Sequence, residues 1–209
     1  MKNILTAACL GVLALGLAHA SIIPTFVSMT NLGGGVFAYN YDVFVESPGE
    51  RLQMTTTAGV GGVPSAGFDN HFTFFDFLGY VPGSASCSGS AVCGDFAVNV
   101  SNVGPSAYQQ LPTDSSSLPN VTWTYNSSST TPPGSYLGRY TLDSTAGGLG
   151  TIQFVAQSTK DTGLQDGTVT GNIVNTVGPG SLVPEPATLF LLGLGLISFR
   201  LSHKRLVSK

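Results

Sequence analysis

The sequence is short of charge: only 9% of its 209 residues are Asp, Glu, Lys or Arg, against about 25% in an average soluble domain. A chain kept unfolded by charge repulsion needs many charges and few aromatic residues, so that class is excluded. Glycine (27 residues) and aromatic side chains (10%) are frequent instead. Turn-forming residues between aromatic and β-branched runs are typical of an all-β domain.

Positive charge is almost missing from the middle of the chain. Between residues 21 and 180 the basic residues are Arg51, Arg139 and Lys160. The same region contains ten acidic residues, so its formal charge is 3 − 10 = −7. The acidic residues are Asp42, Glu46, Glu50, Asp69, Asp76, Asp95, Asp114, Asp143, Asp161 and Asp166. A surface of this sign repels phosphate, so we expect no nucleic-acid partner.

Histidine is equally scarce, because His71 is the only one between residues 21 and 180. No Gly-x-Ser-x-Gly motif surrounds a serine, although a Ser-His-Asp arrangement with distant partners stays open. Asp69, Asn70 and His71 would point in alternate directions on a strand, and the segment 161–167 lacks the alternating oxygen ligands of a calcium loop. We therefore expect no enzymatic activity, no cofactor and no metal site, and diffuse calcium binding by the acids stays open.

The N-terminus has the three parts of a secretory signal peptide. Lys2 precedes an apolar run from Ile4 to Ala18, and a small-x-small site, Ala18-His19-Ala20, follows. This order predicts cleavage by signal peptidase after Ala20, which makes residues 1–20 the signal peptide. The alternatives are a buried helix and an uncleaved anchor, but the run is short for a membrane span.

Two cysteines remain beyond the signal peptide. Cys87 and Cys93 have five residues between them, mostly Ser, Gly and Ala. In an exported protein such a pair predicts a small disulfide loop, whereas a two-cysteine metal site is the alternative.

The C-terminal segment, residues 181–209, combines a proline motif, an apolar run and a basic tail. Pro184, Glu185 and Pro186 precede 13 apolar or small residues, 187–199, and the tail contains Arg200, Lys204 and Arg205. As a helix this run is about 20 Å long, whereas a hydrocarbon core is about 30 Å thick. It predicts a marginal transmembrane helix with its basic end in the cytoplasm and the main domain outside.

From Val183 to Arg205 the chain resembles the PEP-CTERM protein-sorting segment of Gram-negative bacteria, with a basic cluster that is somewhat more spread than usual. The resemblance implies that exosortase, a membrane-embedded transpeptidase-like cysteine protease, cuts near Pro184-Glu185-Pro186. It also implies transient residence in the inner membrane, then release or transfer to the cell surface. Association with exopolysaccharide or biofilm matrix is a further expectation from the family.

Residues 21–180 are enough for one domain, and they predict a single antiparallel β-sandwich, immunoglobulin-like or jelly-roll. Several runs alternate in polarity; in one of them Phe96, Val98 and Val100 share a face and are expected to be buried. The nine expected strands are Ile22–Met29, Val36–Val45, Leu52–Thr57, Phe72–Tyr80, Asp95–Ser101, Val121–Tyr125, Arg139–Leu142, Thr151–Gln157 and Thr168–Val174.

The stretch from His71 to Ser84 is the most aromatic part of the chain. It resembles a segment of PEP-CTERM ectodomains in which an aromatic strand with an Asp-Phe step ends in Val-Pro-Gly. Strand aromatics usually fill a core, but an exposed row could stack on sugar rings. Two functions are therefore weighed: a structural or adhesive surface protein, and a carbohydrate-binding module.

Overall fold

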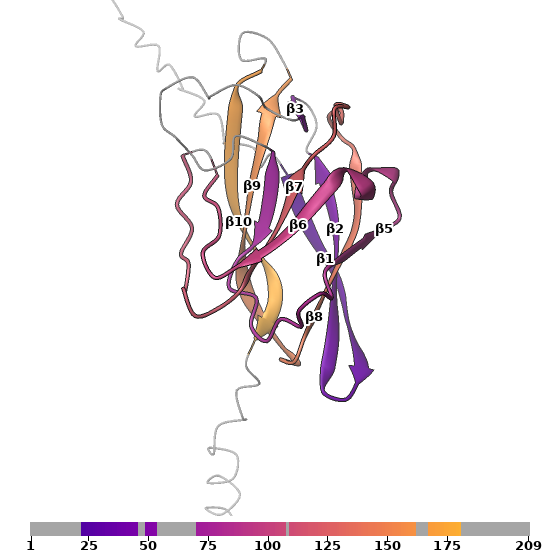
Figure 1. Ribbon diagram of the computed structural model, residues 1–209, viewed down its shortest axis with the longest axis vertical. Helices are drawn as coiled ribbons and strands as arrows, with labels where there is room; N and C mark the ends of the chain where they lie inside the picture. Colours follow the sequence, from indigo (N-terminus) through magenta and orange to yellow (C-terminus); the bar gives the residue numbers. More distant parts are fainter. Residues whose placement is uncertain (1–21, 46–48, 54–69, 108, 162–166, 181–209) are drawn as a thin grey trace, which may run out of the picture.

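The protein is seen in a computed structural model that describes residues 22–45, 49–53, 70–107, 109–161 and 167–180. These residues form two antiparallel sheets that pack face to face (Figure 1). The prediction of an all-β antiparallel sandwich is confirmed.

The first sheet has the strand order β1-β2-β8-β5. Its strands are β1 (Ile22–Gly33), β2 (Val36–Val45), β8 (Tyr136–Ser144) and the short β5 (Ser86–Ser88). In β2 the side chains of Tyr39, Tyr41 and Val43 are fully buried, and the intervening Asn40 and Asp42 are not. This period of two is why the segment pairs as a strand with one face inward.

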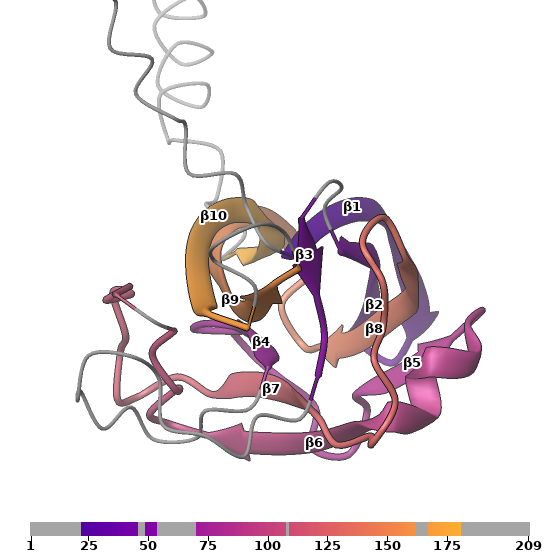
Figure 2. The same ribbon diagram turned by 90° about the horizontal axis from the view of Figure 1, so that it is seen from above.

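The second sheet has the order β10-β9-β4-β7-β6, and β3 pairs beside it with β9. Its strands are β10 (Val169–Gly180), β9 (Gly148–Lys160), β4 (His71–Phe74), β7 (Asn120–Tyr125), β6 (Phe96–Ser101) and β3 (Glu50–Arg51). A 3-10 helix, η1 (Ala91–Asp95), joins β5 to β6. Viewed from above, the edge strands β1 and β10 lie side by side (Figure 2).

Aromatic rings from both sheets form the core. The ring of Phe72 stacks on Trp123 and Phe154 at centroid distances of 5.4 and 5.5 Å. Tyr140 of the opposite sheet meets the same ring edge-on at 4.9 Å. Phe72, Trp123, Phe154 and Tyr140 are all at most 1% exposed. The sheets are therefore held together by interlocked rings, each burying a large apolar area.

Two local predictions were wrong. The strand expected from Phe72 to Tyr80 ends at Phe74, because Asp76 has a left-handed backbone (φ +52°) and its N–H donates to the Asn120 side chain. No strand was expected between Tyr80 and Asp95, but this segment contains β5 and η1. The strand expected over Leu52–Thr57 stays a prediction: Leu52 makes an isolated bridge to Thr131, and residues 54–57 lie outside the described part.

The expected buried face of β6 is also wrong. Phe96 does contact the core, but Val98 is 46% exposed and Val100 is 40% exposed. The reason is topological: β6 is an edge strand, and the edge of the opposite sheet on that side is the three-residue β5. Alternation along a strand therefore predicts which side chains share a face. It does not predict whether the opposite sheet covers that face.

Candidate functional site

The strand directions place the two ends of the domain at opposite poles. At one pole Ile22 begins β1 opposite Val45, and this end we call the leader pole. At the other, Gly180 ends β10 opposite Gly148. Residues 181–209 therefore leave from the second pole, which we call the exit pole; it is the lower end in Figure 1.

The exit pole contains a contiguous corner made by three chain segments: the β1–β2 turn with its flanks (30–37), the β8–β9 turn with the start of β9 (145–150), and the end of β10 (178–180). We call it the exit corner. The Tyr39 hydroxyl lies 2.7 Å from the carbonyl oxygens of both Ala146 and Gly148 and shares its single proton between them. Gly147 sits so close to the Phe37 ring that an added Cβ would lie 2.4 Å from it. These contacts fix the two turns against each other.

The leader pole contains two ion pairs. The Lys160 ammonium contacts Glu50, whose other carboxylate oxygen accepts from the Ser158 hydroxyl at 2.6 Å. Arg51 pairs with Asp161. Four of the ten charged residues in the described part of the chain therefore lie at the pole opposite the exit corner.

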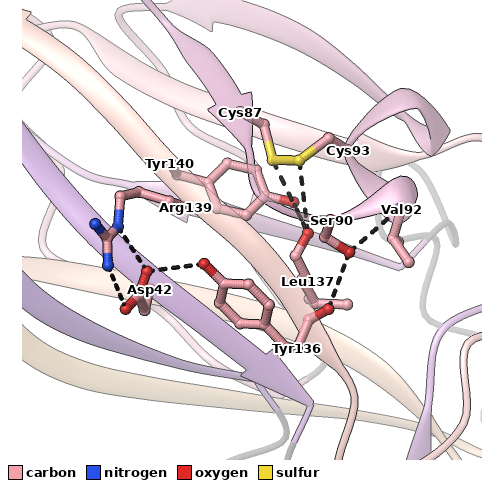
Figure 3. The surroundings of a disulfide bond; sticks show 9 residues. All are labelled: Asp42, Cys87, Ser90, Val92, Cys93, Tyr136, Leu137, Arg139 and Tyr140. Carbon is pink, nitrogen blue, oxygen red and sulfur yellow. Dashed lines mark hydrogen bonds and ion pairs between the residues drawn. A yellow bond between two sulfur atoms is a disulfide. The ribbon is translucent and has the colours of Figure 1, made fainter.

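The disulfide predicted between Cys87 and Cys93 is present, and it closes the loop that contains η1 (Figure 3). The Ser90 hydroxyl accepts from the Val92 N–H and donates to the Tyr136 carbonyl at 3.1 Å, which fixes the loop to β8. The Leu137 carbonyl oxygen lies 3.9 and 3.8 Å from the two sulfur atoms. These are packing contacts, because a bonded sulfur has no proton to donate.

Gly138 is what allows this close approach. A Cβ on Gly138 would lie 2.6 Å from Cys87 Sγ and 2.7 Å from Cys93 Sγ, and the residue has φ +132°. The pairing of β2 with β8 shifts register between Val43 and Phe44, next to Gly138. The disulfide therefore packs directly on the irregular backbone of β8, in a structural role.

Beside the disulfide, Asp42 links β2 to β8. Arg139 donates to both of its carboxylate oxygens at 2.9 Å, and the Tyr136 hydroxyl donates at 3.0 Å (Figure 3). The hydrogen bond from Arg139 is the main cause of a lowered pKa at Asp42. Burial, assisted by the hydrogen bond to Asp42, raises the pKa of Tyr136.

The aromatic run singled out in the sequence is interior. Phe72, Phe74, Phe75 and Phe77 are 0% exposed, so they cannot stack on a sugar ring. His71 of the same strand is 3% exposed. In the described residues no group of three or more His, Cys, Asp or Glu side chains is placed to hold a metal ion.

A groove that the sequence did not reveal runs between the edges of β1 and β10. Its volume is about 450 Å³, and its lining residues are Pro24, Thr25, Phe26, Thr151, Asn175, Thr176 and Val177. The half-buried Phe26 ring packs against Tyr41 at 5.7 Å. The side chains of Thr25, Thr151 and Asn175 are exposed. The lining combines one aromatic ring with apolar side chains, three threonine hydroxyls and one amide.

The sorting residues Pro184, Glu185, Pro186, Arg200, Lys204 and Arg205 and the leader residues Ala18 and Ala20 lie outside the described residues. None of the helices within the described ranges is long and apolar enough to cross a membrane.

The family comparison addresses the C-terminal segment directly. The PEP-CTERM protein-sorting motif matches residues 182–205. No curated protein matches the chain. The chain is thus a PEP-CTERM sorting-motif protein: it is exported, it is anchored in the membrane in transit, and exosortase is its processing partner.

Proposed function

We propose that the β-sandwich is a structural, non-enzymatic component of the extracellular matrix, left at the cell surface in association with exopolysaccharide after two cuts. Signal peptidase removes residues 1–20, and exosortase cuts near Pro184-Glu185-Pro186. The observation that carries the proposal is the sorting motif at 182–205, which begins two residues after the last strand.

In the described residues, the cysteine and histidine side chains that could act as nucleophile or base are part of the disulfide or the core, which supports a structural role. Both cysteines of the domain are joined in the disulfide, and His71 lies in the core. The sandwich is fixed by interlocked aromatic rings, by the disulfide on β8 and by ion pairs at the leader pole. Such a domain is suited to persist outside the cell, where disulfides stay oxidised.

The processing step is tested by replacing Pro184, Glu185 and Pro186 with alanine in the full chain. We expect the variant to stay in the inner membrane with its tail uncut, and mass spectrometry of both termini reports this directly. Alanines at Pro132 and Pro133, a proline pair of the β7–β8 connection, should leave processing unchanged. Surface delivery of the motif variant at its normal mature mass would disprove the sorting role of the motif.

The groove between β1 and β10 favours a second function, carbohydrate binding, at a place other than the buried aromatic run. If it binds polysaccharide, Asn175→Ala should weaken retention on the producing strain's exopolysaccharide, measured by affinity electrophoresis. Asn175 is exposed, so this change should not unfold the domain. Phe44→Ala is the matched control, since Phe44 is 39% exposed but lies away from the groove on Tyr136. Equal retention of both variants and the parent chain would exclude the groove.

A further inference from the structure

The three segments of the exit corner contain neither acid nor base, and Asp143, which pairs with Ala38, lies beside them. The sequence has no charged residue over 22–41, 144–159 or 167–184, and the corner is built from these three segments. It also exposes two leucines: Leu32 beside the β1–β2 turn is 56% exposed, and Leu149 at the start of β9 is 59% exposed. Large exposed apolar side chains on a charge-free surface mark a contact site.

The position of the corner indicates what it contacts. Leu149 pairs with Pro179, one residue before Gly180, so it lies where the sorting segment leaves. Six residues, 181–186, separate Gly180 from the apolar run that starts at Ala187. Fully extended, six residues span about 20 Å. While the sorting segment is in the membrane, the exit corner is therefore held within about that distance of the lipid.

We infer that the exit corner rests on the lipid bilayer surface while the protein awaits exosortase, with Leu32 and Leu149 in the interfacial region. This inference rests on the membrane-anchored stage and is independent of the proposed matrix function. In Figure 1 the β1–β2 turn is the part of the coloured chain that reaches farthest beyond the sandwich at this pole, so it arrives first at a surface below it.

Electrostatics favours the same orientation. Anionic lipid headgroups repel carboxylates within about 10 Å, the Debye length at 0.1 M salt. A domain whose charges are mostly acidic therefore approaches most closely with a side that has few carboxylates; Asp143, near the end of β8, lies beside the exit corner but outside it. The two most exposed large apolar side chains of the described residues do not offer such a side: Leu111 and Val103 lie in the β6–β7 connection, which also contains Asp114. The corner's Gly33, Gly34 and Gly35, all with positive φ, form a compact turn with no side chain to obstruct the approach.

A short tether also lowers the affinity that the contact requires. Once the sorting segment is inserted, contact between corner and lipid is an intramolecular event at high effective concentration. Two leucines are then enough to bias the orientation, although they would not bind a free domain to a membrane.

The test uses the chain after leader removal, residues 21–209 with the sorting segment intact, reconstituted without exosortase in vesicles of phosphatidylethanolamine and phosphatidylglycerol that contain a lipid-borne quencher. An environment-sensitive fluorophore is attached at Leu32→Cys, at Leu149→Cys, or at Ser128→Cys, an exposed control at the leader pole. We expect a blue shift and quenching by lipid at positions 32 and 149, and neither at 128. Equal, unquenched emission at all three positions would overturn the inference.

Two further arms separate lipid from other occupants. Leu32→Glu should abolish the quenching of the fluorophore at position 149, whereas Leu111→Glu, at the 89% exposed Leu111, should not. Protection at position 32 that appears only when exosortase is added would assign the corner to the enzyme. Protection that persists in detergent and rises with protein density would assign it to a second copy. Either result would replace the lipid surface as the partner.

Discussion

Gly138 has a backbone conformation, φ +132°, that residues with a side chain rarely adopt, and the disulfide occupies the space where its Cβ would lie. Gly138→Ala therefore combines backbone strain with overpacking, and we expect it to lower the free energy of unfolding by about 3 kcal/mol. Urea unfolding followed by the fluorescence of Trp123, the single tryptophan, measures this.

Two controls isolate the disulfide contact. Gly83→Ala also places a side chain on a backbone with positive φ (+79°), with nothing within 4 Å of the new Cβ, so it should cost about 1 kcal/mol. In a Cys87→Ala/Cys93→Ala background the sulfur atoms are gone, and the effect of Gly138→Ala should fall toward that of the Gly83 control, with the Ser88 carbonyl oxygen, 3.0 Å from the new Cβ, as the remaining close contact. An unchanged effect in that background would show that the disulfide is not what requires glycine.

Two aspartates of the first sheet should respond to pH with opposite sign. The pKa of Asp42 is lowered, mainly by the hydrogen bond from Arg139. Its contribution to stability is therefore present above the ordinary pKa, near 4, and is lost as the pH falls through the lower folded value. Burial raises the pKa of Asp143, so its ionised form destabilises the fold once the pH rises above the folded value.

Urea unfolding at pH 7 and pH 3 tests this pair. Asp42→Asn should lower stability at pH 7, and Asp143→Asn should raise it. Both differences from the parent chain should shrink as the pH falls from 7 to 3, and that of Asp42 should shrink at the lower pH because its folded pKa is the lower of the two. If the two variants shift stability in the same direction at pH 7, the assignment of one carboxylate as favourable and the other as unfavourable is wrong.

At the scale of elements, β4 and β7 supply the rings that hold the sheets together. Phe72→Ala removes a ring in contact with Trp123, Phe154 and Tyr140. Such a truncation costs about 3–5 kcal/mol, a large part of the 5–15 kcal/mol of a typical domain. We expect Phe72→Ala to unfold at much lower urea concentration, while Phe44→Ala on the outer face shifts the midpoint little. A stable Phe72→Ala domain would contradict the placement of this ring in the core.

The sequence-based predictions succeeded where an element depends on its own residues. The alternation of Tyr39, Tyr41 and Val43 with polar neighbours is legible in the sequence, and β2 has the predicted bounds. The predictions failed where contacts with residues distant in the sequence determine the secondary structure. The three residues of β5 have no strand pattern, and pairing with β8 beside the disulfide makes them a strand.

The candidate sites also divide into those that depend on residues close together in the sequence and those that only the fold brings together. The disulfide and the sorting motif are local in sequence: the first was predicted from the spacing and composition around its cysteines, and the second from a resemblance to a known family. The groove combines residues about 150 positions apart, such as Phe26 and Thr176, so no sequence window contains it. The exit corner could have been anticipated in part, because its three uncharged segments are visible in the sequence, but only the strand order brings them together.

At the scale of the whole molecule, the two ends of the sandwich face opposite ways. The 12 residues of β10 correspond to a length of about 40 Å between the poles. The proposed leader cut after Ala20 leaves a single residue, Ser21, before β1. If residues 1–20 are a signal peptide, as proposed, the leader pole is held at the membrane until they are removed, and once the sorting segment inserts, the exit pole is held there too. A domain anchored at both poles must lie on its side.

We therefore expect the domain to contact the membrane through its exit corner only after the leader has been removed. Ala18→Leu with Ala20→Leu removes the small side chains of the cleavage site, so the leader should remain, as mass spectrometry of the N-terminus can verify. In this variant we expect the fluorophore at Ser128→Cys to become quenched by lipid, in contrast to the cleaved chain. Because the tilt moves the sorting segment relative to the domain, exosortase processing should also slow. An unquenched Ser128→Cys fluorophore on a chain that retains its leader would show that the orientation does not depend on leader removal.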